Sequence, residues 1–163
     1  MAVLNIHERV LPATAGEVGA LIDGLAGAED RLWPADAWPP MRLDAGLAPG
    51  SSGGHGPVRY TVTAFTPGQW VRFAFTAPRG LHGFHELSAH PRGDGTVRLC
   101  HTLAATLRGP ARLTWPLFYR WMHDALLEDS LDRAERTLTG TVRRPTRHSR
   151  YVRLLRRAAA RRR

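Results

Sequence analysis

The sequence predicts an α+β fold in which a curved antiparallel β-sheet of six to seven strands wraps around one long C-terminal helix, with two short helices after the first strand. Two observations support this. Strand-like segments joined by short turns fill the chain from Met41 to Arg108, and a single long helical pattern, Thr114 to Leu138, follows them. An apolar sheet face and an amphipathic helix are complementary surfaces, so each can bury the other.

Length and composition indicate one soluble domain. The chain has 163 residues, and all 23 of its basic residues are Arg, which we interpret as the codon bias of a GC-rich bacterial genome. No apolar run reaches the roughly 20 residues needed to span a bilayer, and the first residues do not resemble a signal peptide, so we expect a cytoplasmic protein. The single Cys100 excludes an internal disulfide and cannot form a zinc–thiolate site alone.

The positive charge is confined to the C-terminus. Residues 1–140 hold 13 Arg and 14 acidic residues, whereas residues 141–163 hold 10 Arg and no acid, which accounts for the net charge of +9. We therefore divide the chain into a nearly neutral domain, residues 1–140, and an Arg-rich tail, residues 141–163. Arguments from charge concern only the tail.

The N-terminal segment predicts a strand followed by helix. AVLNIHERV alternates as a strand does, and Pro12 ends it. Thr14 and Glu17 have the spacing of a capping box, in which each side chain bonds the backbone N–H of the other residue. A short helix follows, and a second helical turn is expected around residues 28–33 before a proline-rich segment.

The middle of the chain predicts an antiparallel meander. Its connections are short and contain Pro-Gly, Pro-Arg-Gly or Gly-Asp-Gly, which favour turns. A parallel crossover needs a dozen residues or more, so neighbouring strands must pair antiparallel. The expected strands are Met41–Leu47, Pro57–Thr66, Gln69–Ala77, Leu81–Ala89 and Thr96–Leu107.

The long helix is predicted to be amphipathic, with Thr114 as its N-cap, Pro116 in its first turn and Gly140 as its stop. At 3.6 residues per turn one face gathers apolar side chains and is expected to be buried: Leu117, Trp121, Leu127, Leu131, Ala134 and Leu138. The opposite face is expected to be solvated and carries charges: Glu128, Asp129, Asp132, Arg133, Glu135 and Arg136.

The order of elements and several segments resemble a known superfamily. The segments are GHGPVRYTVTAFTPGQWVRFAFTAP, GLHGFHEL, RLCHTLAATLRG and WMHDALLED, within residues 1–140. They resemble the helix-grip proteins called SRPBCC, which include START domains, birch-pollen-allergen-like proteins and bacterial polyketide cyclases. The resemblance implies a deep apolar cavity between the sheet and the long helix, open at one end. It implies no single function, because the fold hosts lipid carriers, cyclases, hydrolases and receptors.

Three histidines and an acid are the candidate catalytic residues: His85, His101, His123 and Asp124. His101 falls on the strand face that we expect to point inward, and His85 lies on the preceding strand. If the turn between these strands has an odd number of residues, the two imidazoles come directly opposite, with Cβ atoms about 5 Å apart. A slip of one residue would instead bring Phe84 or Glu86 inward.

A histidine pair and an acid in an apolar pocket suit a general base and proton shuttle, since imidazole titrates near neutral pH. The reactions implied are enolisation, cyclisation or dehydration of a carbonyl substrate. The alternative, and the commoner case, is that such histidines are hydrogen-bonded and specify packing. Glu86 and Glu128 are alternative acids, whose default role is solvated surface. No HxH or HxxxH spacing indicates a metal, and we expect no metal and no cofactor.

Aromatic and apolar residues are expected to contact the ligand. Trp33 and Trp38 precede prolines and suit the rim of the cavity, although such residues more often pin a loop to the core. The Gly-rich segment 49–57 resembles a phosphate cradle only superficially, and we interpret it as a loop at the cavity mouth. The other expected wall residues are Tyr60, Phe73, Phe75, Leu99, Leu103, Trp115 and Trp121.

The tail has a helical pattern in which apolar residues near Tyr151 and Leu155 alternate with arginines. A basic amphipathic segment binds anionic membranes, so residues 143–163 are a candidate membrane contact, and the alternative is a disordered extension. Nucleic acid is disfavoured because the domain offers no basic face. The sequence thus predicts binding of a small hydrophobic or polyketide-like molecule, with catalysis by a His base open. The rival is a non-catalytic lipid or hydrophobic-ligand carrier tethered to a membrane.

Overall fold

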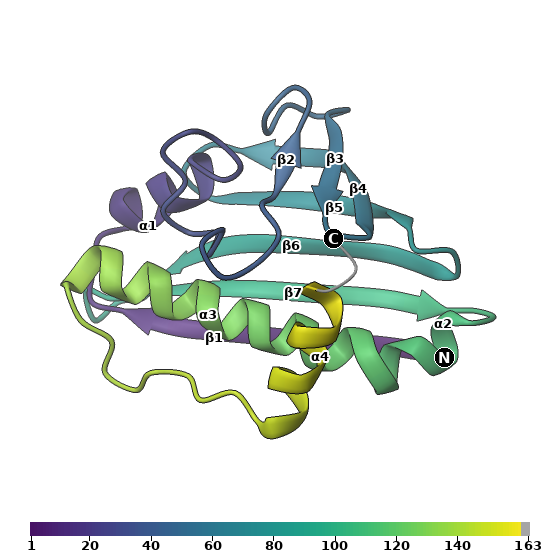
Figure 1. Cartoon of the computed structure of the whole chain (residues 1–163). Helices are drawn as coiled ribbons and strands as arrows, with labels where there is room; N and C mark the ends of the chain where they lie inside the picture. The colour runs from purple at the N-terminus through teal and green to yellow at the C-terminus, as the bar shows by residue number, and fades with distance from the viewer. Residues whose placement is uncertain (161–163) are drawn as a thin grey trace.

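The computed structural model describes residues 1–160 and has the predicted α+β fold (Figure 1). A seven-stranded sheet in the order β1-β7-β6-β5-β4-β3-β2 is antiparallel throughout. The strands are β1 (Ala2–Leu11), β2 (Arg42–Leu43), β3 (Ser52–His55), β4 (Val58–Thr66), β5 (Trp70–Ala77), β6 (Leu81–Pro91) and β7 (Val97–Leu107).

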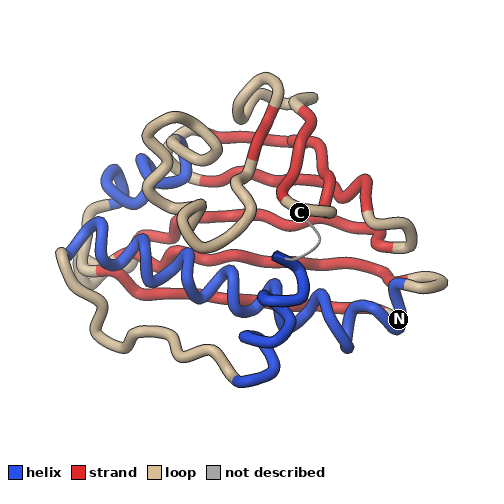
Figure 2. The backbone as a smooth tube through the Cα atoms, viewed as in Figure 1, coloured by secondary structure: helices blue, strands red, loops and turns tan. Residues whose placement is uncertain are grey.

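One long helical run lies across the sheet, nearest to β1 and β7 (Figure 2). It consists of α2 (Ala111–Thr114), a π-helical turn η1 (Trp115–Tyr119) and α3 (Arg120–Thr139). The remaining helices are α1 (Ala15–Asp23), after the first strand, and α4 (Arg150–Ala160), in the tail. Among residues 1–160, none of these helices is both long and apolar enough to cross a membrane.

The predicted signals at the start of α1 and at the end of α3 are confirmed, whereas Thr114 does not cap the long helical run and lies inside it. Thr14 and Glu17 form the capping box of α1, and Gly140 ends α3 with φ of +78°, a conformation that suits glycine. The long run begins at Ala111, earlier than predicted. Pro116 lies in the π-helical turn, because a residue without an N–H cannot make the regular bond to the carbonyl four residues before it.

Residues 28–57 differ from the sequence prediction in detail. The expected strand Met41–Leu47 is reduced to β2, whereas β3 occupies half of the segment expected to be a loop. Residues 28–33 form turns organised by Asp30, whose carboxylate accepts hydrogen bonds from the backbone N–H groups of Leu32 and Trp33 at 2.8 Å. A carboxylate that bonds the nearby backbone competes with helix formation.

Strand β1 presents its polar side chains to the helix. Asn5, His7 and Arg9 point toward α3 and bond its acidic residues, whereas Leu4 and Ile6 on the other face are 68% and 51% exposed. This is the reverse of the usual apolar-in arrangement of a half-buried strand. The inner face of β1 therefore carries polar and charged side chains that bond the acidic residues of α3.

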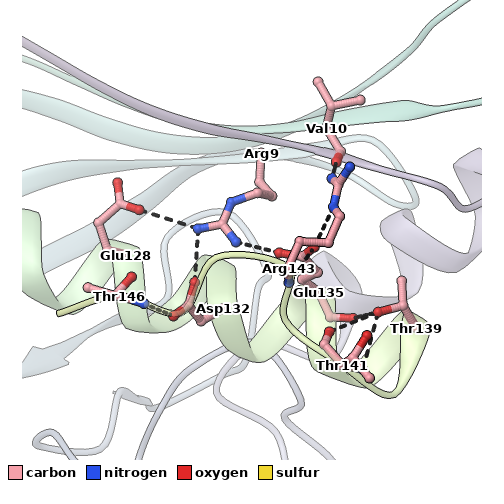
Figure 3. A network of polar contacts seen from close by, with 9 residues as sticks. All are labelled: Arg9, Val10, Glu128, Asp132, Glu135, Thr139, Thr141, Arg143 and Thr146. Carbon is pink, nitrogen blue, oxygen red and sulfur yellow. Dashed lines mark hydrogen bonds and ion pairs between the residues drawn. The ribbon is translucent and has the colours of Figure 1, made fainter.

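Arg9 joins β1 to α3 through buried ion pairs (Figure 3). One guanidinium nitrogen donates to Oε2 of Glu135 at 2.6 Å, and the other donates to Oδ1 of Asp132 at 2.9 Å. Glu135 is 2% exposed and Asp132 is 8% exposed. The prediction that these two acids are solvated is wrong, because Arg9 neutralises them in the interior.

The first turns of the long helical run also differ from the prediction in which side chains they bury. Leu127, Leu131 and Ala134 are buried as predicted, but Leu117 and Trp121 are 63% and 41% exposed. The π-helical turn that precedes α3 shifts the helix phase, because it has more residues per turn than an α-helix. The predicted apolar stripe is therefore correct only for the C-terminal half of the run.

The tail lies against α3 (Figure 1). Arg143 donates to Oε1 of Glu135 at 2.9 Å, the backbone N–H of Thr146 donates to Oδ2 of Asp132 at 2.7 Å, and His148 bonds Asp129 at 3.0 Å. Val152 of α4 is buried. Residues 143–152 therefore pack on the domain, while residues 161–163 of the predicted tail lie outside the described part of the chain.

Candidate functional site

A cavity of about 940 Å³ lies between the sheet and the long helical run. Its wall is mainly apolar, which suits a small molecule with a large apolar surface. The wall combines β6 and β7, the inner face of the helical run, the proline-rich loop after α1, and one face of α4. Characteristic lining residues are Met41, Phe75, Leu81, Leu87, Leu103, Leu107, Trp115, Tyr119, Met122, Leu126 and Leu155.

Helix α4 forms part of the cavity wall at the proline-rich loop. The guanidinium of Arg156 lies 4.6 Å from the ring centroid of Trp38 and donates to the carbonyl oxygen of Ala37 at 2.9 Å. The indole N–H of Trp38 donates to Asp129 of α3 at 2.7 Å. These contacts join the loop, α3 and α4 at one place on the cavity.

His85 and His101 line the cavity and contact each other. The loop between Pro91 and Val97 has five residues, an odd number, so both histidines are on the inner face. They are not directly opposite, because His85 pairs with Leu103 and His101 pairs with Leu87, two residues further along the strand. The diagonal neighbours still share a hydrogen bond of 3.3 Å between Nε2 of His101 and Nδ1 of His85.

Burial keeps both imidazoles neutral. His85 is 6% exposed and His101 is 4% exposed, and His85 stacks on Phe73 and Phe75 at centroid distances of 4.8 and 5.0 Å. Desolvation lowers the pKa of each histidine well below its usual value, and the positive charges of neighbouring histidines would lower it further. At neutral pH each ring is therefore uncharged, with one of its two nitrogens carrying no hydrogen.

His123 extends the pair toward the helix. Its ring lies 5.1 Å from that of His101, and its Nδ1 lies 3.6 Å from Oδ1 of Asp124. Burial lowers the pKa of His123 despite this carboxylate. Asp124 is not among the residues lining the cavity, and it lies behind His123, where Asn5 donates to its Oδ1 at 2.9 Å.

His7 is a fourth histidine in the cluster formed by His85, His101 and His123, and the sequence did not predict it. It pairs with His101 across β1 and β7, its Nδ1 bonds Oε1 of Glu128 at 2.7 Å, and its Nε2 lies 3.2 Å from Oδ1 of Asp124. Burial lowers the pKa of His7, but the bonds to the two carboxylates outweigh it and raise the pKa to about 9. The sequence shows that His7 shares one strand face with Asn5 and Arg9, but it does not show that this face meets the helix.

His55 lines the cavity together with His85, His101 and His123, and it too was not anticipated. It ends β3, in the segment expected to be a loop, and its Nδ1 bonds the hydroxyl of Tyr60 at 3.1 Å. Desolvation lowers the pKa of His55 to about 3. Of the acids considered as alternatives, Glu128 belongs to this site, whereas Glu86 pairs with Arg72 at 2.8 Å away from the cavity.

The expected ligand-contacting residues are only partly at the cavity. Those that line it are Trp33, Trp38, Phe75, Leu103 and Trp115. Tyr60, Phe73 and Leu99 are fully buried but absent from the lining, so they belong to the core. Trp121 lies on the surface, with its indole N–H donating to the carbonyl of Pro116 at 2.9 Å.

Comparison with known proteins gives likenesses of structure. No family model matches the sequence, and no curated protein matches it. Norcoclaurine synthase from Thalictrum flavum, solved in complex with dopamine and hydroxybenzaldehyde, superimposes with a TM-score of 0.60 at 13% identity, covering 80% of this chain and 84% of that chain. Ara h 8.0201 superimposes with a TM-score of 0.60 at 12% identity, covering 86% of this chain and 100% of that chain.

A third similar structure is StfQ, a di-domain ARO/CYC from the steffimycin biosynthetic pathway. It superimposes with a TM-score of 0.63 at 14% identity, covering 86% of this chain and 51% of that chain. At such low identity these likenesses concern the fold, and function is a separate question. The chain has the helix-grip fold that these structures share, as the resemblance of its sequence implied.

Proposed function

We propose that this protein binds a small, largely apolar carbonyl compound of polyketide-like character and catalyses proton transfer next to the carbonyl group, as in cyclisation or dehydration. The observation that carries the proposal is the pair His85 and His101, two neutral imidazoles buried in the wall of a cavity of about 940 Å³. Two proteins of similar fold support it: norcoclaurine synthase, solved with dopamine and hydroxybenzaldehyde, and the ARO/CYC protein StfQ from the steffimycin biosynthetic pathway.

The proposed reaction is a proton transfer that needs only the imidazole and the carbonyl compound. A neutral imidazole takes a proton from the carbon next to the carbonyl, which leaves an enolate and an imidazolium, and the imidazolium returns a proton to carbon or oxygen. The hydrogen bond between His101 and His85 lets the second ring share the charge. The apolar wall excludes water from the reacting atoms.

Deuterium exchange of 2-tetralone tests this function. This bicyclic ketone is an apolar probe with exchangeable protons next to its carbonyl, and NMR in D₂O measures their loss. We expect His101→Ala to slow the protein-catalysed exchange by about 10²-fold or more, since a positioned general base contributes about 10²–10⁴-fold. Binding of the ketone should stay within a few fold, because the apolar wall is unchanged.

Two leucine substitutions test the cavity itself. Leu103→Trp fills the space beside His85 and should weaken binding of 2-tetralone by about tenfold or more, with loss of exchange. Leu4→Trp, on the exposed face of β1, is the matched control and should change neither. Unchanged exchange in His101→Ala removes this residue from the mechanism and leaves the carrier function, and unchanged binding in Leu103→Trp contradicts the cavity as the site.

A second candidate function, contact with an anionic membrane, is favoured by one surface. Tyr151 of α4 meets the helical run there: its hydroxyl donates to the carbonyl of Leu117, and its ring lies 6.0 Å from that of Trp121. Leu113 and Leu154 are 68% and 62% exposed. Exposed arginines of the same helices accompany them: Arg112, Arg120, Arg150 and Arg153.

Vesicle sedimentation tests this surface, which we call the Tyr151 patch. The protein should bind vesicles that contain phosphatidylserine and leave them at high salt, because each Arg near an anionic surface contributes about 1 kcal/mol. Leu154→Glu should reduce the bound fraction by about tenfold, since a carboxylate is repelled by the surface. Ile6→Glu, an exposed apolar site on β1, is the control. Equal binding to neutral vesicles would contradict an electrostatic contact.

A further inference from the structure

We propose that His7, His123 and Asp124 form a binding site for a divalent metal ion of the Zn²⁺ type. One ligand atom from each residue lies within 4.8 Å of the others, on the inner side of the domain between β1 and α3. Two imidazoles and one carboxylate are a common donor set for Zn²⁺ and related ions. This inference stands apart from the proposed base chemistry, because it rests on other atoms.

The distances suit the first coordination shell. Oδ1 of Asp124 lies 3.2 Å from Nε2 of His7 and 3.6 Å from Nδ1 of His123. Ligand atoms bound to one tetrahedral Zn²⁺ at about 2.0–2.1 Å lie about 3.3 Å apart, so the present separations need only small side-chain movements. The ion would replace the proton that His7 and Asp124 share.

The surroundings have the features of a second coordination shell. The Nδ1–H of His7 donates to Glu128 at 2.7 Å, so Nε2 is the nitrogen that would bind a metal once the ion displaces its proton, and carboxylate–histidine–metal chains of this kind are general in zinc sites. Asn5 donates to Asp124 at 2.9 Å and fixes the carboxylate, and Arg9 holds Glu128 at 3.4 Å. Each ligand is therefore oriented by a further residue.

His123 supplies the independent sign of a ligand. Neither of its ring nitrogens has a hydrogen-bond partner among the described residues, although both are buried, and Nδ1 of the neighbouring His101 is in the same situation. Buried polar atoms without partners are rare in folded proteins. A metal ion bound to one ring nitrogen of His123 would satisfy that atom.

The site adjoins the cavity, which gives the ion a chemical role. His123 is one of the cavity-lining residues, whereas His7 and Asp124 are not, so the ion would lie beside the ring of His123, toward β1 and next to the cavity. Three protein ligands leave one position open on a tetrahedral ion. A carbonyl oxygen of a bound molecule can occupy that position, where the ion polarises the carbonyl as a Lewis acid.

Sequence spacing gives no sign of this site. His7 and Asp124 are separated by 117 residues, and His123 and Asp124 are adjacent rather than spaced by a helical turn. The set forms only when β1 pairs with β7 and α3 packs over it. The absence of an HxH or HxxxH motif is therefore explained by the ligands coming from two distant elements.

Titration of the tag-free full-length protein with Zn²⁺ and Co²⁺ tests the site. We expect one equivalent of Zn²⁺ by calorimetry, and Co²⁺ should give the visible absorption bands of a four-coordinate ion. His7→Ala, His123→Ala and Asp124→Asn should each weaken binding more than tenfold, and Glu128→Gln by about 10–100-fold. His82→Ala removes an exposed histidine outside the cluster and should leave the affinity unchanged.

The outcomes are distinct from those of the exchange assay. Absence of Zn²⁺ binding to the wild-type protein overturns the metal site and leaves His7 as a charged partner of two carboxylates. Equal binding by the wild type and the ligand variants also overturns it, because the ion is then elsewhere. Asp124→Asn preserves the shape of the side chain, and thermal unfolding with and without Zn²⁺ checks that each variant is folded. Exchange of 2-tetralone in metal-free buffer tests the base chemistry of His101 and its partner His85 without any contribution from a metal ion.

Discussion

Replacing Arg9 by methionine is expected to lower the free energy of unfolding by about 3–5 kcal/mol, the usual effect of removing one partner from a buried ion pair. Arg9 is the charge that β1 contributes to Glu135 and Asp132, at 2.6 and 2.9 Å. Without it Glu135 keeps only Arg143, and Asp132 keeps the backbone N–H of Thr146 (Figure 3). Denaturant unfolding followed by circular dichroism measures the change.

Arg98→Met is the matched control for this substitution. Arg98 lies 3.7 Å from Glu8, and both side chains are close to half exposed, so its loss should change the free energy of unfolding by less than about 1 kcal/mol. A double variant, Arg9→Met with Asp132→Asn, should recover part of the loss, because Asp132 is the carboxylate that is left without a cation. A loss below about 1 kcal/mol in Arg9→Met would show that water or relaxation solvates these acids.

The fold was predictable because its signals are local. The turns at Pro67-Gly68 and Pro78-Arg79-Gly80 fix antiparallel neighbours, and the capping box and Gly140 mark helix ends within a few residues of themselves. The start of the long helical run was less predictable. A π-helical turn at Pro116 has no distinct sequence pattern, and its phase shift places Trp121 on the surface.

The site was predictable only in part because its contacts are long-range. Parity along the two strands predicted a shared face for His85 and His101 only if the loop between them had an odd number of residues, and the loop has five. Nothing in β1 alone indicates which of its two faces meets the helix, so His7 and Arg9 were not recognised as inward residues. Glu135 looked like a solvated helix residue because its partner, Arg9, lies 126 residues away.

The free energy of unfolding is expected to be greatest near pH 7 and to fall on both sides. On the acid side the cause is the buried imidazoles. Desolvation holds the pKa values of His85 and His101 well below 6.5 and lowers that of His55 to about 3, so these residues are neutral in the folded state but bind protons when unfolded. As the pH falls below about 6.5, each such residue removes about 1.4 kcal/mol per pH unit.

On the alkaline side His7 causes the free energy of unfolding to fall as the pH rises. Its pKa is about 9 in the folded protein, because the bonds to Asp124 and Glu128 outweigh burial, against 6.5 for the free side chain. Its contribution is therefore complete below pH 6.5 and is lost progressively as the pH rises to about 9, at about 1.4 kcal/mol per unit.

Urea unfolding between pH 5 and pH 9 in metal-free buffer tests both limbs. His101→Asn should flatten the acid limb and His7→Gln the alkaline limb, whereas His82→Ala, which is exposed, should reproduce the wild-type profile. A stability that rises steadily up to pH 9 would contradict the charged state of His7. A flat profile from pH 7 to pH 5 would mean that the buried histidines take up protons while the protein stays folded, because only equal proton uptake by the two states removes the slope.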